Sequence, residues 1–514
     1  MTFKPYIEFL FLIILGAATS LSLPPFNYLI INFFTFTLFF LFLIKKSNKK
    51  ENKNLFFFYG WLFGFGYFFS NLYWISISLT FDQNFKFLIP LTVFLIPALL
   101  AIFYGLISFF FFVFKPKKII SSFLVFSLIF GIVEFLRGSI LTGFPWNLIA
   151  YSFFGYLEIL SVTSIIGTYG FNLFCISLFT CPAIFFLRKN KKEIFVYIFF
   201  LFFVFSFYIY GNLYAKKFNT SNLETFDYSL RVIGSNISID RFISDVNPVL
   251  VIEELIKLSD PNKNEKTIFV WPEGIFPEIS QRELKEYNWL FEKKFNEKHF
   301  LILGINSKIS KNGSQKYFNS LSIYDDKLDL IDSYNKIKLV PFGEFLPFEN
   351  LFKKFGFKSL VNNYQSFSIG EKRKILEIKK RNFSLKILPL ICYEIIYSGE
   401  LFDNTNFDLI INISEDGWFG KSIGPKQHFA HSIFRAIESG KYIIRSANNG
   451  MAGIINPLGV VEQKVIYGQS GYLDLNSIRK IQPTIFSKYG NKIFGLLILL
   501  YIFLIISFNK IRNE

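Results

Sequence analysis

Apolar residues crowd into two parts of this chain, before about residue 213 and after about residue 490. A helix that crosses a bilayer needs about 20 mostly apolar residues. Seven apolar segments of roughly that length precede the more polar middle of the chain and one follows it: residues 6–22, 28–44, 55–76, 87–114, 119–140, 155–187, 194–210 and 493–508. The pattern predicts a seven-helix membrane domain over residues 1–213 and an eighth membrane helix over residues 491–508.

The middle of the chain, residues 220–485, has a different pattern. Short runs rich in β-branched residues alternate there with amphipathic helical stretches, which is typical of an α/β domain. Hydrophobic residues make up 52% of the whole chain and aromatic residues 20%, which is too apolar for an ordinary soluble enzyme. We therefore expect a multi-span α-helical membrane domain joined to one α/β domain outside the bilayer.

The distribution of positive charge along the chain indicates how the protein is oriented in the membrane and does not indicate a polyanionic partner. The formal net charge is +17. Lysine and arginine gather in every second predicted loop: residues 45–53, 115–118, 188–192 and 510–512. Because short cytoplasmic loops collect basic residues, these loops are expected on the inner side and residues 220–485 on the outer side. Much of the positive charge is thus topological, and we expect no nucleic-acid partner.

One predicted membrane segment carries a pair of opposite charges. Glu134 and Arg137 lie one helical turn apart, just before a Gly-Phe-Pro-Trp loop that contains Phe144 and Trp146. Ionisable residues in a span are costly, so they pair with each other or line a polar cavity. Two interpretations stay open: a salt bridge that holds the helix to its loop, or a lining for a lipid substrate, with the aromatic rings guiding acyl chains.

Three predicted strand ends in the middle domain carry reactive side chains. Glu273 follows the strand TIFV, and Cys392 closes the apolar run LKILPLI. The stretch YNKIKLVPFGEFLP contains Lys336 and, eight residues on, Glu344. Each residue alone is commonly a solvated turn residue or an inert buried thiol. Together they supply a base, a cation and a nucleophile, the set that acyl transfer through a thioester needs.

These residues stand in motifs that resemble known families. The stretches VWPEG, YNKIKLVPFGEFLPFE and ICYE resemble the nitrilase superfamily. With EFLRGSILTGFPWN, DGWFGKSIGPKQHFAHSIFRAIESGKYIIRSANNG and the span layout, the whole chain resembles the apolipoprotein N-acyltransferase family. The resemblance implies a nitrilase-like four-layer αββα sandwich. It also implies a catalytic triad of Glu273, Lys336 and Cys392, and it gives supporting roles to Glu344, Tyr393 and Glu394.

The resemblance further implies a reaction and a place. A phospholipid would donate its sn-1 acyl chain, and the N-terminal amine of a diacylglyceryl-cysteine in an apolipoprotein would accept it. The protein would be a monomer in the bacterial inner membrane with its catalytic domain in the periplasm, and it would use no cofactor. The family usually has a tryptophan early in the outer domain, where this chain has Phe242.

Two other functions fit the same residues. A membrane-tethered amidase would keep the triad but use water as the acceptor. A transporter with an inactive outer domain would need paired charges in several spans, and the sequence offers mainly Glu134 and Arg137. The three histidines, His299, His428 and His431, have no metal-binding spacing, so we expect no metal site.

Overall fold

A computed structural model describes residues 5–49, 51–188, 193–311, 314–347, 366–381, 383–401 and 404–510. Contacts between Cα atoms divide the chain into two compact units. The helical unit comprises residues 1–216, 421–430 and 484–514, and the α/β unit comprises residues 217–420 and 431–483. The grouping of residues 421–430 with the helices had no signal in the hydrophobic pattern.

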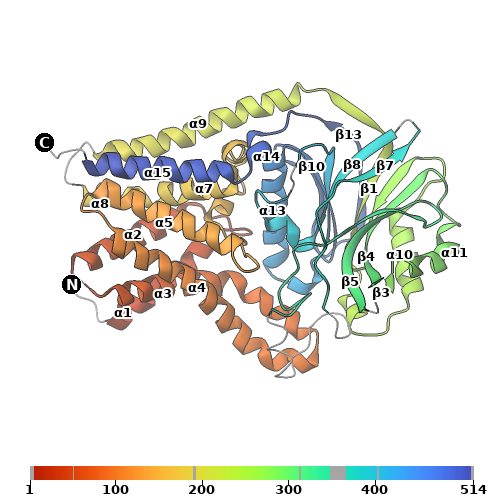
Figure 1. Cartoon of the computed structure of the whole chain (residues 1–514), viewed down its shortest axis with the longest axis horizontal. Coiled ribbons are helices and arrows are strands. Elements are labelled where there is room, and N and C mark those ends of the chain that lie inside the picture. The colour runs from red at the N-terminus through yellow and green to blue at the C-terminus, as the bar shows by residue number, and fades with distance from the viewer. Residues whose placement is uncertain are drawn as a thin grey trace. The chain divides into compact units, whose positions relative to one another are not determined.

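The helical unit contains a helix for each predicted apolar segment (Figure 1). Its main helices are α1 (Pro5–Ser20), α2 (Ile30–Asn48), α3 (Lys53–Leu72), α4 (Ile89–Phe114), α5 (Ile119–Ser139), α7 (Thr163–Thr180), α8 (Pro182–Leu187), α9 (Ile194–Asn219) and α15 (Lys492–Lys510). The segment predicted at 155–187 is divided into a short helix, α6 (Leu157–Leu160), followed by α7 and α8.

Seven helical segments in the described part of the chain are long and apolar enough to cross a membrane. The helix α1 spans 16 described residues and is shorter than these seven. At about 1.5 Å per residue, its described length covers less than the roughly 30 Å hydrocarbon core. The assignment of all eight apolar segments as membrane spans therefore stays a prediction.

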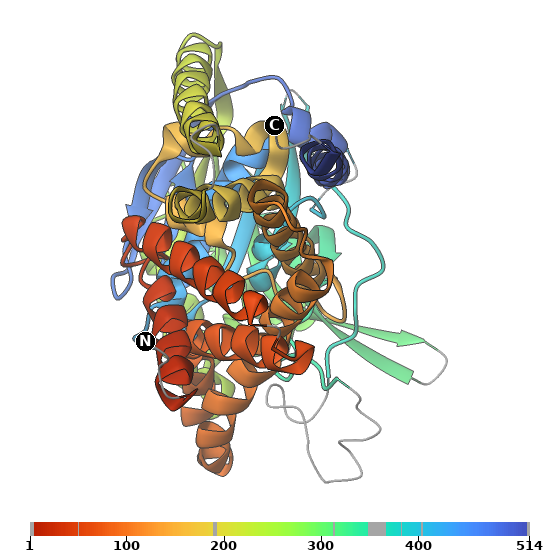
Figure 2. The ribbon, with the colours of Figure 1, turned by 90° about the vertical axis from the view of Figure 1, so that its left-hand side faces the viewer.

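Close backbone approach joins α1, α3 and α4. A Cβ atom added at Gly66 would lie 2.0 Å from the carbonyl oxygen of Ile13, and one added at Gly60 would lie 2.2 Å from that of Tyr104. Only glycine fits such crossings, which is how small residues let helices pack in a membrane. In contrast, α9 lies at the edge of the bundle (Figure 2), and only 11% of its most apolar window is buried by protein.

The α/β unit is built on one sheet whose described part has 13 strands. Along the sheet the order is β6-β5-β4-β2-β1-β10-β9-β8-β7. These strands are β6 (Leu330–Asn335), β5 (Ser314–Tyr324), β4 (His299–Lys311), β2 (Thr267–Val270), β1 (Leu223–Ser235), β10 (Tyr442–Asn448), β9 (Leu409–Glu415), β8 (Phe383–Ile391) and β7 (Leu376–Lys380). Four more strands pair off this path: β3 (Phe276–Ser280), β11 (Ala452–Ile455), β12 (Val461–Val465) and β13 (Gly471–Arg479).

The sheet is folded into two layers that face each other. Among the described strands, the two halves join where the end of β1 pairs with the end of β10, at Gly234 with Ala447 and Ser235 with Asn448. Alternate residues of both halves, such as Val232, Ile302 and Ile411, form one shared apolar core. Burial of this core holds the layers together.

Helices cover the outer faces of both layers (Figure 1). The helix α10 (Pro248–Ser259) and the short α11 (Asn288–Phe291) pack on the first layer through a second core that includes Trp271. The part of α13 (Gly424–Ser439) from His431 onward lies on the opposite side of the strands. The α/β unit is thus the four-layer αββα sandwich that the sequence resemblance implied.

Candidate active site

The thiol of Cys392 lies at a sharp turn that ends β8. All residues of β8 from Ile387 to Ile391 are apolar and buried. Cys392 has a φ of 47°, in the left-handed region, and it begins the 3₁₀ helix η7 (Cys392–Ile396). A non-glycine residue in this region is strained and is held there by its surroundings. Such a turn exposes one side chain at the strand end, as a nucleophile requires.

A buried lysine joins two carboxylates beside this turn. The Lys336 Nζ atom lies 3.2 Å from Glu273 Oε1 and 3.0 Å from Glu344 Oε1. The Asn319 amide donates to the same two oxygen atoms at 2.7 Å each. The side chains of Glu273, Lys336, Glu344 and Asn319 are all buried. The structure therefore brings together three of the sequence-predicted residues, with the carboxylates of Glu273 and Glu344 beside the ammonium group of Lys336.

The second oxygen of each carboxylate is fixed by the backbone. The N–H of Glu415 donates to Glu273 Oε2 at 3.0 Å, and the N–H of Val340 donates to Glu344 Oε2 at 2.8 Å. Glu415 ends the parallel strand β9, next to β8, while Glu273 follows β2. The carboxyl ends of strands from both layers thus position Glu273.

The charges of this cluster act on the thiol. Burial raises the pKa of the Cys392 thiol well above its ordinary value, the carboxylate of Glu273 raises it further, and the ammonium of Lys336 opposes this only in part. Burial would lower the pKa of Lys336, but Glu273 and Glu344 raise it above its ordinary value. At neutral pH the resting cluster therefore holds a neutral thiol and a charged lysine.

Glu344 has a second electrostatic role. Burial raises the pKa of its carboxyl group above the ordinary value more than Lys336 lowers it, and the nearby Glu273 carboxylate adds to the rise. When two carboxylates share one cation, one carboxylate can gain a proton while the other stays paired with the cation. The site can therefore accept a proton while keeping the lysine charged.

Glu394, two residues after the thiol, ties separate segments together. Its Oε1 accepts hydrogen bonds from Tyr334 Oη at 2.6 Å and from the backbone N–H groups of Ile337 and Lys338 at 3.1 and 3.3 Å. Its Oε2 accepts from the Ile391 N–H at 2.9 Å. Ile391 and Ile337 adjoin Cys392 and Lys336, so this carboxylate sets the position of both reactive residues.

Arg373 completes this support. It forms an ion pair with Glu394 at 3.0 Å, and both side chains are largely buried. Burial alone would raise the pKa of Glu394, but Arg373 and the hydrogen bonds hold it below its ordinary value. Tyr393, between Cys392 and Glu394, is buried, and its ring meets that of Tyr397 edge to face at 5.5 Å.

Phe242, at the position where the family usually has a tryptophan, has an aromatic neighbour. Its ring lies 5.0 Å from that of Trp418, and the guanidinium carbon of Arg241 lies 4.6 Å above it. The same ring packs on Gly274, directly after Glu273. An indole group is thus present beside Phe242, supplied by a different segment of the chain.

In the helical unit, Glu134 and Arg137 form a closed pair. Arg137 Nη2 lies 2.5 Å from Glu134 Oε2, and Arg137 Nε donates to Oε1 at 3.2 Å. The remaining Nη1 donates to the carbonyl oxygen of Phe144. Both side chains are fully buried, so the pair holds α5 to the loop that follows it.

Trp146 is also a packing residue in this unit. Its indole N–H donates to Gln427 Oε1 at 2.9 Å, and its ring lies 4.9 Å from Trp74 and 5.3 Å from His428. The ring of Phe144 is parallel to it at 6.1 Å. Of the two interpretations of this loop, the observed contacts support a salt bridge that holds helix and loop together, and lipid guiding stays a prediction.

Several residues of the candidate site had no sequence signal. Asn319 is an ordinary polar residue inside β5, and Arg373 lies in a segment without a motif. Tyr334 begins the motif YNKIKLVPFGEFLPFE, but the motif gave it no role. Behind the thiol, the buried pair Arg445 and Asp416 (2.9 Å) holds Ser414, whose hydroxyl donates to Asp416 at 2.7 Å. Asp416 and Arg445 lie in a motif quoted above, but only the pairing of strands distant in sequence shows what they contact.

Two family models match the chain. Residues 15–181 match the apolipoprotein N-acyltransferase N-terminal domain, and residues 294–478 match the carbon-nitrogen hydrolase model. Among solved structures, an amidase of the nitrilase superfamily from Nesterenkonia is 11% identical, with a TM-score of 0.33, over 50% of this chain and 93% of its own.

Curated relatives resemble the chain over most of its length. The apolipoprotein N-acyltransferase of Rhodopseudomonas palustris is 31% identical over 96% of this chain and 93% of its own length. Those of Rhizobium leguminosarum and Rickettsia prowazekii are each 32% identical, over 89% and 93% of this chain and 88% and 94% of their own lengths. On this likeness, which spans both the helices and the α/β unit with its lysine, carboxylates and thiol, the chain belongs to the apolipoprotein N-acyltransferase family and is an acyltransferase.

Proposed function

We propose that this enzyme moves the sn-1 acyl chain of a phospholipid to the N-terminal amine of diacylglyceryl-cysteine in apolipoproteins, with a thioester on Cys392 as the intermediate. The observation that carries the proposal is the buried cluster of Glu273, Lys336 and Glu344, in which the charges of Glu273 and Lys336 act on the Cys392 thiol. The names of the relatives support the class of acceptor, because each is an apolipoprotein N-acyltransferase.

In the first half-reaction the Cys392 sulfur attacks the ester carbonyl carbon of the phospholipid. Since the resting thiol is neutral, its proton must leave as sulfur attacks, and Glu273 accepts it. The C–S bond forms, and Lys336 stabilises the negative oxygen of the tetrahedral intermediate. The ester C–O bond then breaks, and Glu273 returns the proton to the departing lysophospholipid oxygen.

In the second half-reaction the acceptor amine attacks the thioester. Glu273 takes a proton from the amine as the C–N bond forms, and Lys336 again faces the negative oxygen. The C–S bond breaks and the proton returns to sulfur, which restores the neutral thiol. Donor and acceptor thus react in turn, so the kinetics are ping-pong.

Two alternative functions differ from the proposed one, the first in the acceptor of the acyl group and the second in the class of protein. A membrane-tethered amidase would pass the acyl group to water with the same residues. The helical unit favours a lipid-borne acceptor, because a hydrolase of small soluble amides would not need such an anchor. A transporter with an inactive outer domain is disfavoured, since the chain belongs to a family of enzymes.

We also propose a location in the bacterial inner membrane. The basic loops at residues 45–53, 115–118, 188–192 and 510–512 would lie in the cytoplasm, which places the α/β unit in the periplasm. The domains would then be residues 1–213, 220–485 and 491–508. Reporter fusions after residues 50, 116, 220 and 510 test this orientation: a periplasmic reporter active only after residue 220 supports it.

The test of the reaction uses phospholipid that is radiolabelled in its sn-1 chain. Purified full-length protein in detergent, without acceptor, is expected to acquire label that hydroxylamine removes, and Cys392→Ala is expected to acquire none. Cys175→Ala, at a buried cysteine of α7, is the matched control and should be labelled like the wild type.

A chase separates the proposed function from its alternatives. Addition of a diacylglyceryl-cysteine peptide should move the label to the peptide amine much faster than water removes it. Label that is lost to water at the same rate with and without the peptide would favour the amidase. Label on Cys392→Ala would refute the thioester.

A further inference from the structure

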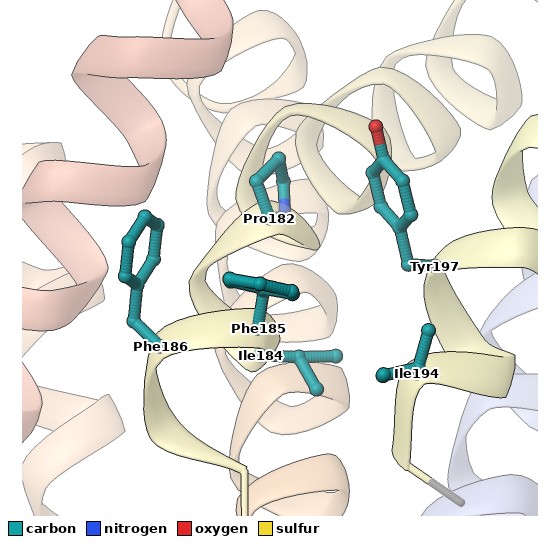
Figure 3. Close-up of a pocket in the computed structure, with 6 residues that line it drawn as sticks. All are labelled: Pro182, Ile184, Phe185, Phe186, Ile194 and Tyr197. Atoms are coloured by element: carbon teal, nitrogen blue, oxygen red, sulfur yellow. The ribbon is translucent and has the colours of Figure 1, made fainter. Parts of the chain in front are cut away.

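A pocket lies between α8 and α9 in the helical unit, formed by residues outside the candidate active site. Its volume is about 260 Å³. Six residues line it: Pro182, Ile184, Phe185, Phe186, Ile194 and Tyr197. Figure 3 shows that α8 and α9 supply facing walls, with Phe185 and Ile184 on one and Ile194 and Tyr197 on the other. The lining is almost wholly apolar, so the pocket fits a hydrocarbon chain.

Arg188 follows the last residue of α8 and contacts one of the residues that line this pocket. Its backbone N–H donates to the Ile184 carbonyl at 2.8 Å, which continues the helical turn. The guanidinium carbon lies 4.0 Å from the centre of the Phe185 ring, and that ring lines the pocket. The charged group therefore stacks on one of the residues that line the pocket.

One nitrogen of this guanidinium group has no acceptor. Nη1 of Arg188 is shielded from solvent and makes no hydrogen bond within the part of the chain that the structure describes. A shielded charged donor without an acceptor is costly, particularly in a membrane protein. The aromatic face of Phe185 supplies attraction to the cation but no hydrogen-bond acceptor. The described residues thus leave room at this position for an anion from another molecule.

We propose that this site binds one anionic phospholipid, with its phosphate on Arg188 and part of an acyl chain in the pocket. Guanidinium groups hold phosphate oxygens through two N–H donors, which satisfies the open nitrogen. The adjoining apolar walls select a lipid over a free anion, since inorganic phosphate would leave them unfilled. The positive charge of Arg188 itself favours an anionic headgroup.

The bound lipid would strengthen a weak part of the helical unit. Protein buries only 11% of the most apolar window of α9, so few contacts hold that helix to the bundle. A lipid chain between Phe185 of α8 and Tyr197 of α9 fills the space that side chains leave. The lipid is therefore a structural ligand of the α8–α9 pair and is separate from the acyl donor.

The test measures lipid bound to the intact full-length protein by native mass spectrometry. Phosphatidylglycerol and phosphatidylcholine with identical acyl chains are compared in the Cys392→Ala background, where no donor is consumed. Since phospholipid also binds as acyl donor, the readout is the difference between variants. Arg188→Gln is expected to lower the apparent affinity for phosphatidylglycerol about fivefold and to change that for phosphatidylcholine little. Lys117→Gln, a matched loss of an exposed basic residue, should change neither.

Further variants test the two parts of the site. Phe185→Ala removes the ring that carries the guanidinium group and is expected to weaken phosphatidylglycerol binding, and its exposed position lets the fold survive. Unchanged phosphatidylglycerol binding by Arg188→Gln would overturn the proposal, as would equal loss of both lipids. If millimolar inorganic phosphate displaced all of the bound phosphatidylglycerol, the proposal that a lipid occupies this site would be wrong. Each outcome is independent of label on Cys392.

Discussion

The helical unit buries Arg137 against Glu134, and the α/β unit buries Lys336 against Glu273 and Glu344. In the first cluster one cation meets one carboxylate through two hydrogen bonds, and the third nitrogen bonds to the Phe144 carbonyl. The charges cancel, and guanidinium does not release protons in proteins. Such a closed pair holds segments together and has little capacity for acid–base chemistry.

The second cluster is not balanced in this way. One ammonium group is shared by two carboxylates, and the charges of Glu273 and Lys336 act on the Cys392 thiol. Because the cluster has more anionic groups than cations, one carboxylate can take a proton while the lysine stays charged. The comparison teaches that charge balance, rather than burial alone, distinguishes a structural pair from a reactive one.

The largest effect is expected from Lys336→Met. The change leaves Glu273 and Glu344 buried without their cation, which should lower the free energy of unfolding by about 3–5 kcal/mol. Loss of the group that stabilises the negative oxygen should lower acyl transfer by about 10²–10³-fold in the molecules that remain folded. Thermal unfolding in detergent and transfer to a diacylglyceryl peptide measure the two effects.

A variant with a balanced charge serves as the control. Lys336→Met combined with Glu344→Gln removes one charge of each sign, so it should recover part of the stability but none of the activity. Recovery of acyl transfer in the double variant would show that Lys336 acts only by neutralising Glu344, and it would break the comparison.

Glu273→Gln should separate activity from thiol reactivity. Without its proton acceptor, acyl transfer is expected to fall by about 10²–10⁴-fold. The carboxylate of Glu273 helps to raise the pKa of the Cys392 thiol, so its neutral replacement should lower that pKa. Alkylation of Cys392 by iodoacetamide, followed from pH 7 to 11, should then rise at lower pH in the variant than in the wild type.

The outcome that contradicts this interpretation is a parallel loss of both reactions. If Glu273→Gln slows alkylation at every pH, Glu273 holds the thiol in place and its charge is not the cause. Glu415→Gln is a useful comparison, because the Glu415 backbone N–H that bonds to Glu273 is retained.

Glu134→Gln tests the closed pair. Arg137 would remain buried with a neutral partner, and we expect a loss of about 3 kcal/mol in the free energy of unfolding. Acyl transfer per folded molecule should change less than about threefold, since the pair only joins α5 to its loop. The midpoint of thermal unfolding and kcat check this. Unchanged stability with a large fall in kcat would assign the pair to lipid handling.

Much of the candidate site could be predicted because its residues end strands. An apolar run such as residues 387–391 is expected to be buried, so the residue after it, Cys392, stands at the end of a strand. The same reasoning applies to Glu273 after β2 and Lys336 after β6. The apolar segments likewise predicted a helix each, because helix-length apolar runs have few other structures.

The remaining residues depend on pairing that sequence patterns do not encode. Asn319 reaches Glu273 and Glu344 only because β5 pairs with β4 in one register. Glu394 meets Tyr334 across 60 positions of sequence, and Trp146 meets Gln427 across 281. The sequence motifs contain Glu394, Tyr334, Trp146 and Gln427, but they do not show which of these residues meet before the strands and helices are assembled.

The smallest effect is expected from Phe144→Ala, which sharpens the comparison within the helical unit. Arg137 bonds to the backbone carbonyl of Phe144, so removal of the ring leaves the ion pair intact. Since the ring is only partly buried, the unfolding midpoint should stay close to that of the wild type, unlike that of Glu134→Gln. If the loop guides acyl chains, the KM for phospholipid should rise about threefold at constant kcat, the scale of a peripheral contact. A KM equal to that of the wild type would leave the loop a purely structural role, with both its charges and its rings serving to hold α5.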